Sequence, residues 1–321
     1  MKLKRNQLTL ILHLIRFKTL DYGSCLQMLD NDRIKASYAF RPLTRHKYIS
    51  KHKDGSVYAL KKGRELIPNA MPLVSLGGGN NERINQISRT VMLLRKAGVN
   101  IVSFPKNTQE DCFIPSACWR KIRTNILSTT RFMGILYVGS HRLAVYDIGD
   151  GTMDWQLRAE RSLFFTVFHE DFDTHATGML FICDEEKRIE IAKKIIRETM
   201  WRRKQLIENN NYIERLRPVK YSKAPIRLNH YYERVYLTTP ATLKESISRI
   251  KTEEDFILNY PQIFSVNPAT DLLKFVYFFS AVKSDACSDY SIALPKQDFP
   301  ILQMYPDVLN VEGIRVYECK Y

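Results

Sequence analysis

The sequence lacks most of the patterns that mark secreted, membrane-spanning and disulfide-rich proteins. Its six cysteines include no Cys-x-x-Cys pair, which favours reduced thiols in a cytoplasmic protein. The apolar residues near the N-terminus are interrupted by His13, Arg16 and Lys18, so they do not read as a signal peptide. The longest apolar run near the end, residues 275–282, is too short to span a bilayer. We therefore expect no membrane partner.

Signatures of catalysis are equally scarce. The sequence contains no Gly-x-Ser-x-Gly motif and no His-x-His pair of the kind that a strand-transfer relaxase needs for its metal. The glycine triplet at residues 77–79 is not followed by Gly-Lys-Ser/Thr, so it does not indicate a phosphate-binding loop. The histidines and carboxylates within residues 169–175 lack the spacing of a zinc site, and a solvated loop explains them better.

What the sequence has in excess is positive charge, and most of that excess lies in one segment. The net charge is +15 over 321 residues. Residues 1–68 hold 15 Lys and Arg against 5 Asp and Glu, whereas the remaining 253 residues hold 34 against 29. Positive charge clustered in this way is typical of a module that binds nucleic acid.

Apolar spacing predicts three helices in this basic segment. The first extends over residues 5–18, and the second over residues 24–29 with Ser24 as its N-cap. The third begins at Arg33. Its inward positions are Ala36, Ala39, Phe40 and Leu43. We expect Pro42 to kink this helix rather than end it, because the apolar spacing continues past the proline.

A hairpin is predicted after the third helix. Short strands are expected at residues 48–51 and 57–60, followed by a short helix at residues 61–67. Asp54-Gly55 between the strands indicates a type I′ turn, which requires positive φ at both central residues. A basic-faced helix that leads into a basic-tipped hairpin is typical of a winged helix-turn-helix.

This predicted winged helix-turn-helix supplies the candidate DNA-binding residues, because its third helix would enter the major groove and its wing would lie along the backbone. The groove-facing candidates are Lys35, Ser37, Tyr38, Arg41, Thr44 and Arg45. The candidates for binding backbone phosphates are Lys47, Lys51, His52 and Lys53. Arginine can grip guanine through two hydrogen bonds, and both cations neutralise phosphates. The alternative is a winged helix that contacts protein, with these charges forming only a solvated surface.

The rest of the chain predicts an α/β domain, which makes the overall fold class α+β. We expect the winged helix over residues 1–67, an uncharged linker rich in Pro and Gly over 68–81, and the α/β domain over 82–321 with a sub-boundary near 208–230. Helices are expected over residues 83–96, 153–168, 184–207 and 241–250. Strands are expected over residues 99–104, 133–138, 142–148, 179–183, 231–238 and 313–321.

The order of these elements is also that of restriction-endonuclease-like folds, so a nuclease is an alternative hypothesis. Restriction-endonuclease-like folds place an Asp and an Asp/Glu-x-Lys on adjacent strands, where the carboxylates hold Mg²⁺ and the lysine steers the attacking water. Asp147 ends a predicted strand, but Gly149 stands where the lysine should be. A second match to the spacing consists of Asp307, Glu318 and Lys320. Apart from this alternative, which would use Mg²⁺, we expect no catalytic residue, metal or cofactor.

Several segments resemble a known family. They are Leu43, Tyr48-Ile49, Tyr58-Ala59-Leu60, Gly63 and residues 133–137, 144–149 and 155–160. In these segments the chain resembles the replication-relaxation family and similar accessory proteins of plasmids and integrative mobile elements. The resemblance implies a winged helix before a degenerate endonuclease-like domain, and a non-catalytic role in replication or conjugative transfer, as in a relaxosome, beside a relaxase or replication protein. A transcriptional repressor is the remaining alternative.

Overall fold

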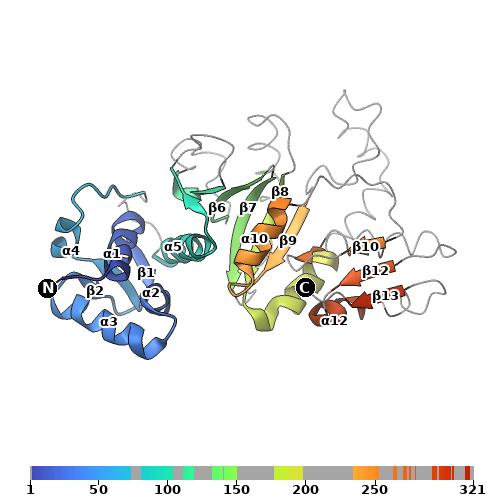
Figure 1. The fold of residues 1–321 in the computed structure, drawn as a ribbon, viewed down its shortest axis with the longest axis horizontal. Coiled ribbons are helices and arrows are strands. Elements are labelled where there is room, and N and C mark those ends of the chain that lie inside the picture. The colour runs from blue at the N-terminus through green and yellow to red at the C-terminus, as the bar shows by residue number, and fades with distance from the viewer. Residues whose placement is uncertain are drawn as a thin grey trace, which may run out of the picture. The chain divides into compact units, whose positions relative to one another are not determined.

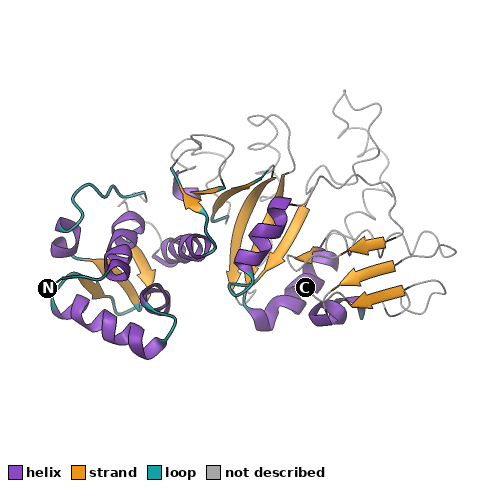
Figure 2. Ribbon diagram, viewed as in Figure 1, coloured by secondary structure: helices purple, strands orange, loops and turns teal. Residues whose placement is uncertain are grey.

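The computed structural model describes the larger part of the N-terminal region and separate segments of the rest of the chain (Figure 1). The described residues are 2–73, 81–103, 111–118, 132–139, 141–149, 177–197, 234–252, 263–265, 270–272, 275, 279, 291–294, 296–304, 306 and 315–318. Contacts between residues divide the chain into two units, Met1–Tyr137 and Val138–Tyr321. Both units contain helices and strands (Figure 2), which confirms the predicted α+β class.

The first 67 residues combine helices with a small antiparallel sheet. The elements are α1 (Arg5–Phe17), β1 (Thr19–Asp21), α2 (Tyr22–Leu29), α3 (Arg33–Arg45), β2 (Ile49–Lys51), β3 (Ser56–Ala59) and α4 (Lys61–Glu65). Strand β3 lies between β1 and β2 and pairs antiparallel with both. The helices and the hairpin lie where they were predicted, whereas β1 was not predicted.

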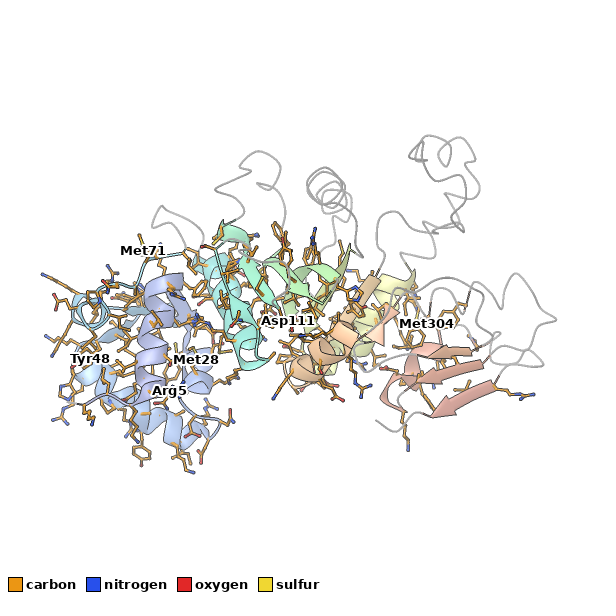
Figure 3. All side chains as sticks on the ribbon, turned by 45° about the horizontal axis from the view of Figure 1, so that its top comes forward. Arg5, Met28, Tyr48, Met71, Asp111 and Met304 are labelled. Carbon is orange, nitrogen blue, oxygen red and sulfur yellow. The ribbon has the colours of Figure 1, made fainter. Side chains whose placement is uncertain are left out.

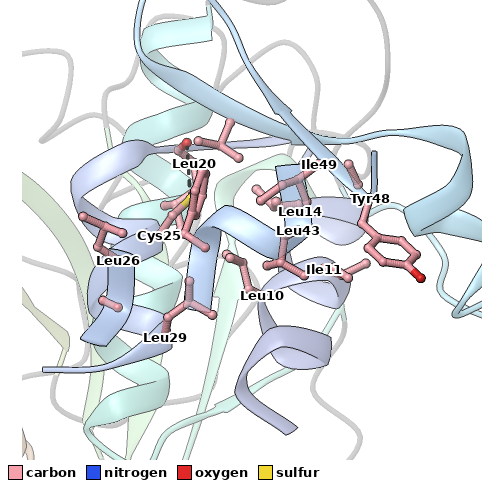
Figure 4. Close-up of a cluster of buried hydrophobic side chains, with 14 residues drawn as sticks. Leu10, Ile11, Leu14, Leu20, Cys25, Leu26, Leu29, Leu43, Tyr48 and Ile49 are labelled. Carbon is pink, nitrogen blue, oxygen red and sulfur yellow. Dashed lines mark hydrogen bonds between the residues drawn. The ribbon is translucent and has the colours of Figure 1, made fainter. Parts of the chain in front are cut away.

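One hydrophobic core joins these elements (Figure 4). Its buried side chains are Leu10, Ile11, Leu14, Leu20, Cys25, Leu26, Leu29, Ala36, Phe40, Leu43, Tyr48, Ile49, Val57 and Ala59. Apart from Tyr48, which lies between α3 and β2, they come from α1, α2, α3 and the three strands. Each fully buried Leu or Ile contributes about 1.5–3 kcal/mol, so the core fixes how α3 is oriented on the sheet and the other helices.

Aspartates begin both α2 and α3. The carboxylate of Asp21 accepts a hydrogen bond from the Ser24 N–H at 2.8 Å, so Asp21 is the N-cap of α2 and the prediction of Ser24 was wrong. The reason is that Asp21 ends β1 in extended conformation, which places its carboxylate over the first turn. Asp32 caps α3 by accepting from the N–H groups of Ile34 at 2.8 Å and Lys35 at 3.3 Å.

Helix α3 continues through Pro42 to Arg45, so the proline does not end it, as predicted. Proline has no N–H to donate to the Tyr38 carbonyl one turn earlier. Phe40 and Leu43, on either side of the proline, are buried in the core, and this packing holds the helix together at the lost bond.

Helix α5 (Asn81–Lys96) packs against α1, β1 and α2 within the first unit. Nε2 of His13 and Oγ of Ser88 lie 2.8 Å apart in a buried hydrogen bond between α1 and α5. The His13 ring also lies beside Phe17, with ring centroids 4.9 Å apart. The helix was predicted, but its packing on the N-terminal helices was not.

Three strands follow α5: β4 (Asn100–Ile101), β5 (Cys112–Pro115) and β6 (Gly134–Val138), and all their residues before Val138 belong to the first unit. Strand β5 pairs parallel with β4 and antiparallel with β6. Strands β4 and β6 fall within predicted strands, whereas β5 was not predicted. The guanidinium of Arg83 donates to the Phe132 carbonyl at 3.1 Å, which ties α5 to the residues before β6.

The second unit is built on parallel strands. They are β7 (His141–Gly149), β8 (Thr177–Cys183) and β9 (Arg234–Thr238), joined at the edge by antiparallel β11 (Thr270–Asp271). Helix α10 (Leu243–Thr252) is linked to β9 by a buried hydrogen bond of 2.7 Å between the hydroxyls of Thr238 and Ser246. These strands and this helix lie where they were predicted, apart from β11. The helix predicted over residues 153–168 lies outside the described residues.

A separate parallel sheet of order β10-β12-β13 follows (Figure 1). Its strands are β10 (Ile263–Ser265), β12 (Ser291–Leu294) and β13 (Arg315–Glu318), with the short helix α12 (Phe299–Leu302) before β13. Residues 188–197, within the helix predicted after β8, are helical. A buried ion pair of 2.5 Å joins Arg188 of that helix to Asp298. Only β13 of this sheet was predicted.

Two findings concern the cysteines and the apolar helices of the described residues. Four cysteines are buried free thiols: Cys25, Cys112, Cys118 and Cys183. Among the helices that the structure describes, none is long and apolar enough to cross a membrane.

Candidate nucleic-acid interface

Helix α3 turns one face into the core and the opposite face to solvent. Its buried side chains are Ala36, Phe40 and Leu43. The exposed side chains opposite to them are Ile34, Tyr38, Arg41 and Arg45. A helix advances by about 100° per residue, which places these four on a single stripe. We call them the α3 outer face.

The α3 outer face combines apolar and cationic groups. Ile34 is 69% exposed and Tyr38 is 65% exposed. The guanidinium carbon of Arg41 lies 5.3 Å from the centroid of the Tyr38 ring, within the range of a cation–π interaction. The face can therefore donate hydrogen bonds through arginine and make apolar contact through Ile34 and Tyr38.

Contacts on the inner side fix the orientation of α3. The amide of Gln7 donates to the Ala39 carbonyl at 2.8 Å, which joins α1 to α3. The rings of Tyr22 and Phe40 meet edge to face with centroids 5.0 Å apart, which joins α2 to α3. These contacts leave the outer face pointing to solvent.

The C-terminal end of α3 closes in a Schellman motif. The N–H of Tyr48 donates to the Leu43 carbonyl at 2.9 Å, and the N–H of Lys47 donates to the Thr44 carbonyl at 3.0 Å. Lys47 has φ 57°, in the left-handed region that glycine usually occupies at this position. The motif places the exposed Lys47 side chain at the corner between α3 and β2.

The hairpin predicted from Asp54-Gly55 is present, but the predicted type I′ turn was wrong. Of the two residues only Gly55 has positive φ, at 86°. Its N–H donates to the His52 carbonyl at 3.1 Å, as in a three-residue loop closed by a left-handed glycine. Asp54 keeps negative φ because its carboxylate accepts from the hydroxyl of Ser56 at 2.6 Å and from its N–H at 2.9 Å. These hydrogen bonds lower the pKa of Asp54.

Two side chains of the hairpin, Lys51 and His52, lie against aromatic rings. Nζ of Lys51 lies 4.4 Å from the centroid of the Tyr22 ring at the start of α2. The His52 ring stacks on Tyr58, with centroids 4.1 Å apart. Lys51 therefore lies against the helices, whereas the exposed Lys53 belongs to the loop at the tip.

The structure places all ten predicted DNA-binding residues in α3, in the hairpin or at the corner between them. Eight are exposed: Lys35, Tyr38, Arg41, Arg45, Lys47, Lys51, His52 and Lys53. Ser37 and Thr44 are half-buried, and the Thr44 hydroxyl donates to the Arg41 carbonyl at 2.9 Å. These two side chains lie beside the α3 outer face and are less suited to reach a groove.

Little negative charge offsets the cations of this surface. Of the five acidic residues before residue 68, four bond to backbone N–H groups: Asp21, Asp30, Asp32 and Asp54. Lys35 is the only cation of residues 2–67 in an ion pair with another described residue, Asp32, at 3.9 Å. That pair is exposed, so it contributes little. The carboxylates are thus used to stabilise local backbone, and the positive charge faces solvent.

Two parts of this surface were missed by the sequence predictions. Ile34 shares its stripe with Tyr38 and Arg41, so helical spacing indicates that it is exposed, but an apolar side chain is not a residue type that marks a DNA contact. Three exposed cations of α4 were also missed: Lys61, Lys62 and Arg64. Nζ of Lys62 lies 5.1 Å from the Tyr48 ring, and a Cβ at Gly63 would collide with the Tyr48 carbonyl. Tyr48 is labelled among the side chains of the N-terminal elements in Figure 3. No local pattern predicts this approach of α4 to the end of α3.

The nuclease candidates do not form a site within the described residues. Asp147 lies in β7 and is buried. Gly149 has φ 46° and follows a break in the β7–β8 register, so a lysine at that position would be strained. Glu318 ends β13, whereas Asp307 and Lys320 lie outside the described residues. In the part of the chain that the structure describes, no group of three His, Cys, Asp or Glu could hold a metal ion.

No protein-family model, curated protein or solved structure matches this chain. The surface formed by α3 and the hairpin carries exposed cations and hydrogen-bond donors. An α-helix is about 10–12 Å wide with its side chains, and the major groove of DNA is about 12 Å wide. The α3 outer face carries two guanidinium groups, and Lys47, Lys51 and Lys53 are exposed at the end of α3 and in the hairpin.

Proposed function

We propose that residues 2–67 are a winged helix-turn-helix that binds duplex DNA, with α3 as the recognition helix and the β2–β3 hairpin as the wing. The order α1-β1-α2-α3-β2-β3 and the antiparallel sheet are compatible with this assignment. The observation that carries it is the α3 outer face, which lies opposite the core and holds Arg41 and Arg45. Arginine side chains on an exposed helix are suited to guanine edges in the major groove.

The residues divide into two roles in this proposal. The α3 side chains Lys35, Tyr38, Arg41 and Arg45 face the groove, with Ser37 and Thr44 at the margin. The phosphates are bound by Lys47, Lys51, His52 and Lys53. Phosphate contacts supply affinity and fix the register, whereas base contacts supply sequence preference. Because both sets are present, we infer a sequence-specific protein.

For the cellular role, we propose a non-catalytic DNA-binding accessory protein of a plasmid or integrative mobile element, acting in replication or conjugative transfer. This rests on the resemblance to the replication-relaxation family. In that reading the remaining part of the chain is a degenerate endonuclease-like domain that extends the DNA contact or recruits a relaxase or replication protein. Gly149 in place of a lysine supports a domain without nuclease activity.

Selection of DNA by the full chain tests this function. The protein is incubated with random duplexes and with fragments of its source DNA, and the retained sequences are determined. We expect one motif, lying beside a transfer or replication origin. A motif confined to promoters would favour a repressor. Retention of no duplex would contradict the DNA-binding proposal. Nicking of plasmid in Mg²⁺ that is lost in Asp147→Ala or Glu318→Ala would contradict the non-catalytic role.

A further inference from the structure

Ile34 is the one aliphatic side chain of the α3 outer face. It is 69% exposed, although isoleucine is among the residue types that are most often fully buried. The outer side of α3 around it carries the polar or charged side chains of Lys35, Tyr38 and Arg41. An exposed isoleucine on the same stripe as two arginines suits a partner that combines an apolar group with negative charge.

The position of Ile34 in α3 is fixed. It is the second residue of the helix, and its N–H donates to the Asp32 cap at 2.8 Å. Its side chain lies on the same stripe as Tyr38, one turn further along, where the ring is held beside the Arg41 guanidinium. In helix-turn-helix proteins the N-terminal residues of the recognition helix contact base edges. Ile34 therefore occupies the part of α3 that comes nearest to the bases.

Only one base carries an apolar group in the major groove. The C5-methyl of thymine is that group, whereas the other exposed atoms of the base edges are hydrogen-bond donors and acceptors. An isoleucine at a base-contacting position gains by packing on this methyl, and it leaves donors and acceptors of other bases without partners.

We propose that Ile34 is a specificity-determining residue that reads thymine by packing on its C5-methyl. The DNA recognised by this chain then contains a thymine opposite the first turn of α3, beside the bases that the arginines contact. The assignment rests on the proposed DNA-binding function and names its substrate class. A protein partner is disfavoured because Arg41 and Arg45, the charged side chains that share the α3 outer face with Ile34, are both cationic.

The test removes the C5-methyl of thymine from the DNA and the Ile34 side chain from the protein, first separately and then together. The full chain first selects its site from random duplexes. Each thymine of that site is then replaced in turn by deoxyuridine, which lacks only the methyl and keeps every hydrogen-bonding group. Dissociation constants are measured by fluorescence anisotropy for the unchanged protein and for Ile34→Ala on both DNAs. Ile34→Val, which removes a single carbon, is measured in parallel.

At one thymine we expect deoxyuridine to weaken binding by the unchanged protein about fourfold, the value of one buried methyl-sized group. Ile34→Ala should weaken binding to the thymine site by at least as much and should no longer distinguish the two DNAs. The affinity of Ile34→Val for the thymine site should lie between that of the unchanged protein and that of Ile34→Ala. The matched control is Met71→Ala, which removes an apolar side chain of similar exposure, 76%, outside the helices and should bind as the unchanged protein does.

Two results would overturn the assignment while leaving the DNA-binding function intact. One is an Ile34→Ala protein that binds the selected site as tightly as the unchanged protein. The other is an Ile34→Ala protein that is weakened but still distinguishes thymine from deoxyuridine as the unchanged protein does. Failure of the unchanged chain to select any DNA would overturn the function and this assignment together. Because Ile34 is exposed, far-ultraviolet circular dichroism of each variant should match the unchanged protein.

Discussion

Arg41 and Arg45 lie about one turn apart on the α3 outer face, and each carries a planar set of donors that fits a guanine edge. We expect Arg41→Ala or Arg45→Ala to weaken binding to the selected site by about 1–3 kcal/mol and to relax the preference at the base that the arginine contacts. Anisotropy titrations with the selected site and its single-base variants measure both effects. Arg5→Ala, an exposed arginine on α1, is the control and should keep the base preference unchanged. Equal losses on all DNAs would rule out a base contact.

Lys53 lies at the tip of the hairpin and is expected to bind a phosphate. Lys53→Ala should weaken binding to all sequences alike and should reduce the slope of affinity against salt by about one unit. Titrations of the selected site and of an unrelated duplex at several salt concentrations check this. A loss confined to the selected site would show that Lys53 reads sequence instead.

His13 gives the fold a dependence on pH. Burial, together with the charge of Arg95, lowers its pKa from 6.5 to about 3, so the imidazole is neutral in the folded protein. The unfolded chain takes up a proton below about pH 6.5 and the folded chain does not, so stability is lost as the pH falls from there towards about 3. The loss is about 1.4 kcal/mol per pH unit in that window. Urea unfolding at about pH 7 and about pH 5 measures it.

The His13→Gln variant is the control for this prediction, since glutamine cannot titrate and can still bond to Ser88. We expect its unfolding free energy to change less between the two pH values than that of the unchanged protein. The same pH dependence in both proteins would assign the effect to other groups.

At the scale of residues, the sequence predicted much of the candidate site. Helical spacing separates Lys35, Tyr38, Arg41 and Arg45 from the buried stripe of α3, and these four are exposed. Burial of Ser37 and Thr44 was not predicted, because they lie at the margin where neighbouring elements decide exposure. The approach of Lys62 to Tyr48 depends on tertiary packing, and no local pattern encodes it.

At the scale of elements, Lys47 has two roles at the junction between α3 and β2, one in its backbone and one in its side chain. Its left-handed conformation costs about 1–2 kcal/mol in residues other than glycine, and its side chain is a proposed phosphate contact. We expect Lys47→Gly to raise stability by about 1 kcal/mol and at the same time to weaken binding to all DNA sequences. Urea unfolding and anisotropy measure the two effects. Lys47→Gln should weaken binding equally without the gain in stability.

If Lys47→Gly lowers stability instead, then contacts of the lysine side chain outweigh the strain of the backbone. If it leaves DNA binding unchanged at every salt concentration, then Lys47 is not a phosphate contact.

The long helices were more predictable than the short strands. Helices α1, α3 and α5 each show apolar spacing over several turns, which is a local signal. Strand β1 has only three residues, Thr19–Asp21, and its partner β3 lies more than thirty residues later, so pairing alone defines it. The Asp54-Gly55 signal predicted the hairpin but not its turn type, because the bonds from Ser56 to the Asp54 carboxylate decide the backbone there.

At the scale of the whole molecule, α5 is part of the fold that supports α3. It packs on α1, β1 and α2, and Ser88 is the hydrogen-bond partner of the buried His13. We expect a fragment of residues 1–73 to be less stable than one of residues 1–98, because removal of α5 exposes to water the apolar surface of α1, β1 and α2 that it covers. Burial of even one aliphatic side chain contributes about 1.5–3 kcal/mol. Urea unfolding of both fragments measures the difference. Equal midpoints would show that the first 73 residues are independent of α5.

The composition of residues 68–81 predicted a linker. It did not predict that α5, which follows this segment, packs on α1, β1 and α2, because such packing depends on residues that are distant in the sequence. Much of the second unit was predicted because β7 and β8 are long apolar runs. The C-terminal sheet was mostly missed, since β10 and β12 have three and four residues and pair in parallel with distant segments. Short strands of this kind are defined by their partners.

The central claim is that the cationic surface of α3 and the hairpin binds duplex DNA. The most direct measurement is the affinity of the full chain for a duplex as salt is varied, for the unchanged protein and for the Arg41→Ala/Arg45→Ala double variant. We predict binding that weakens with salt with a slope of about −0.9 per phosphate contacted, and a clear loss in the double variant at every salt concentration. Absence of binding at about 50 mM salt, or a double variant that binds as the unchanged protein does, would contradict the claim.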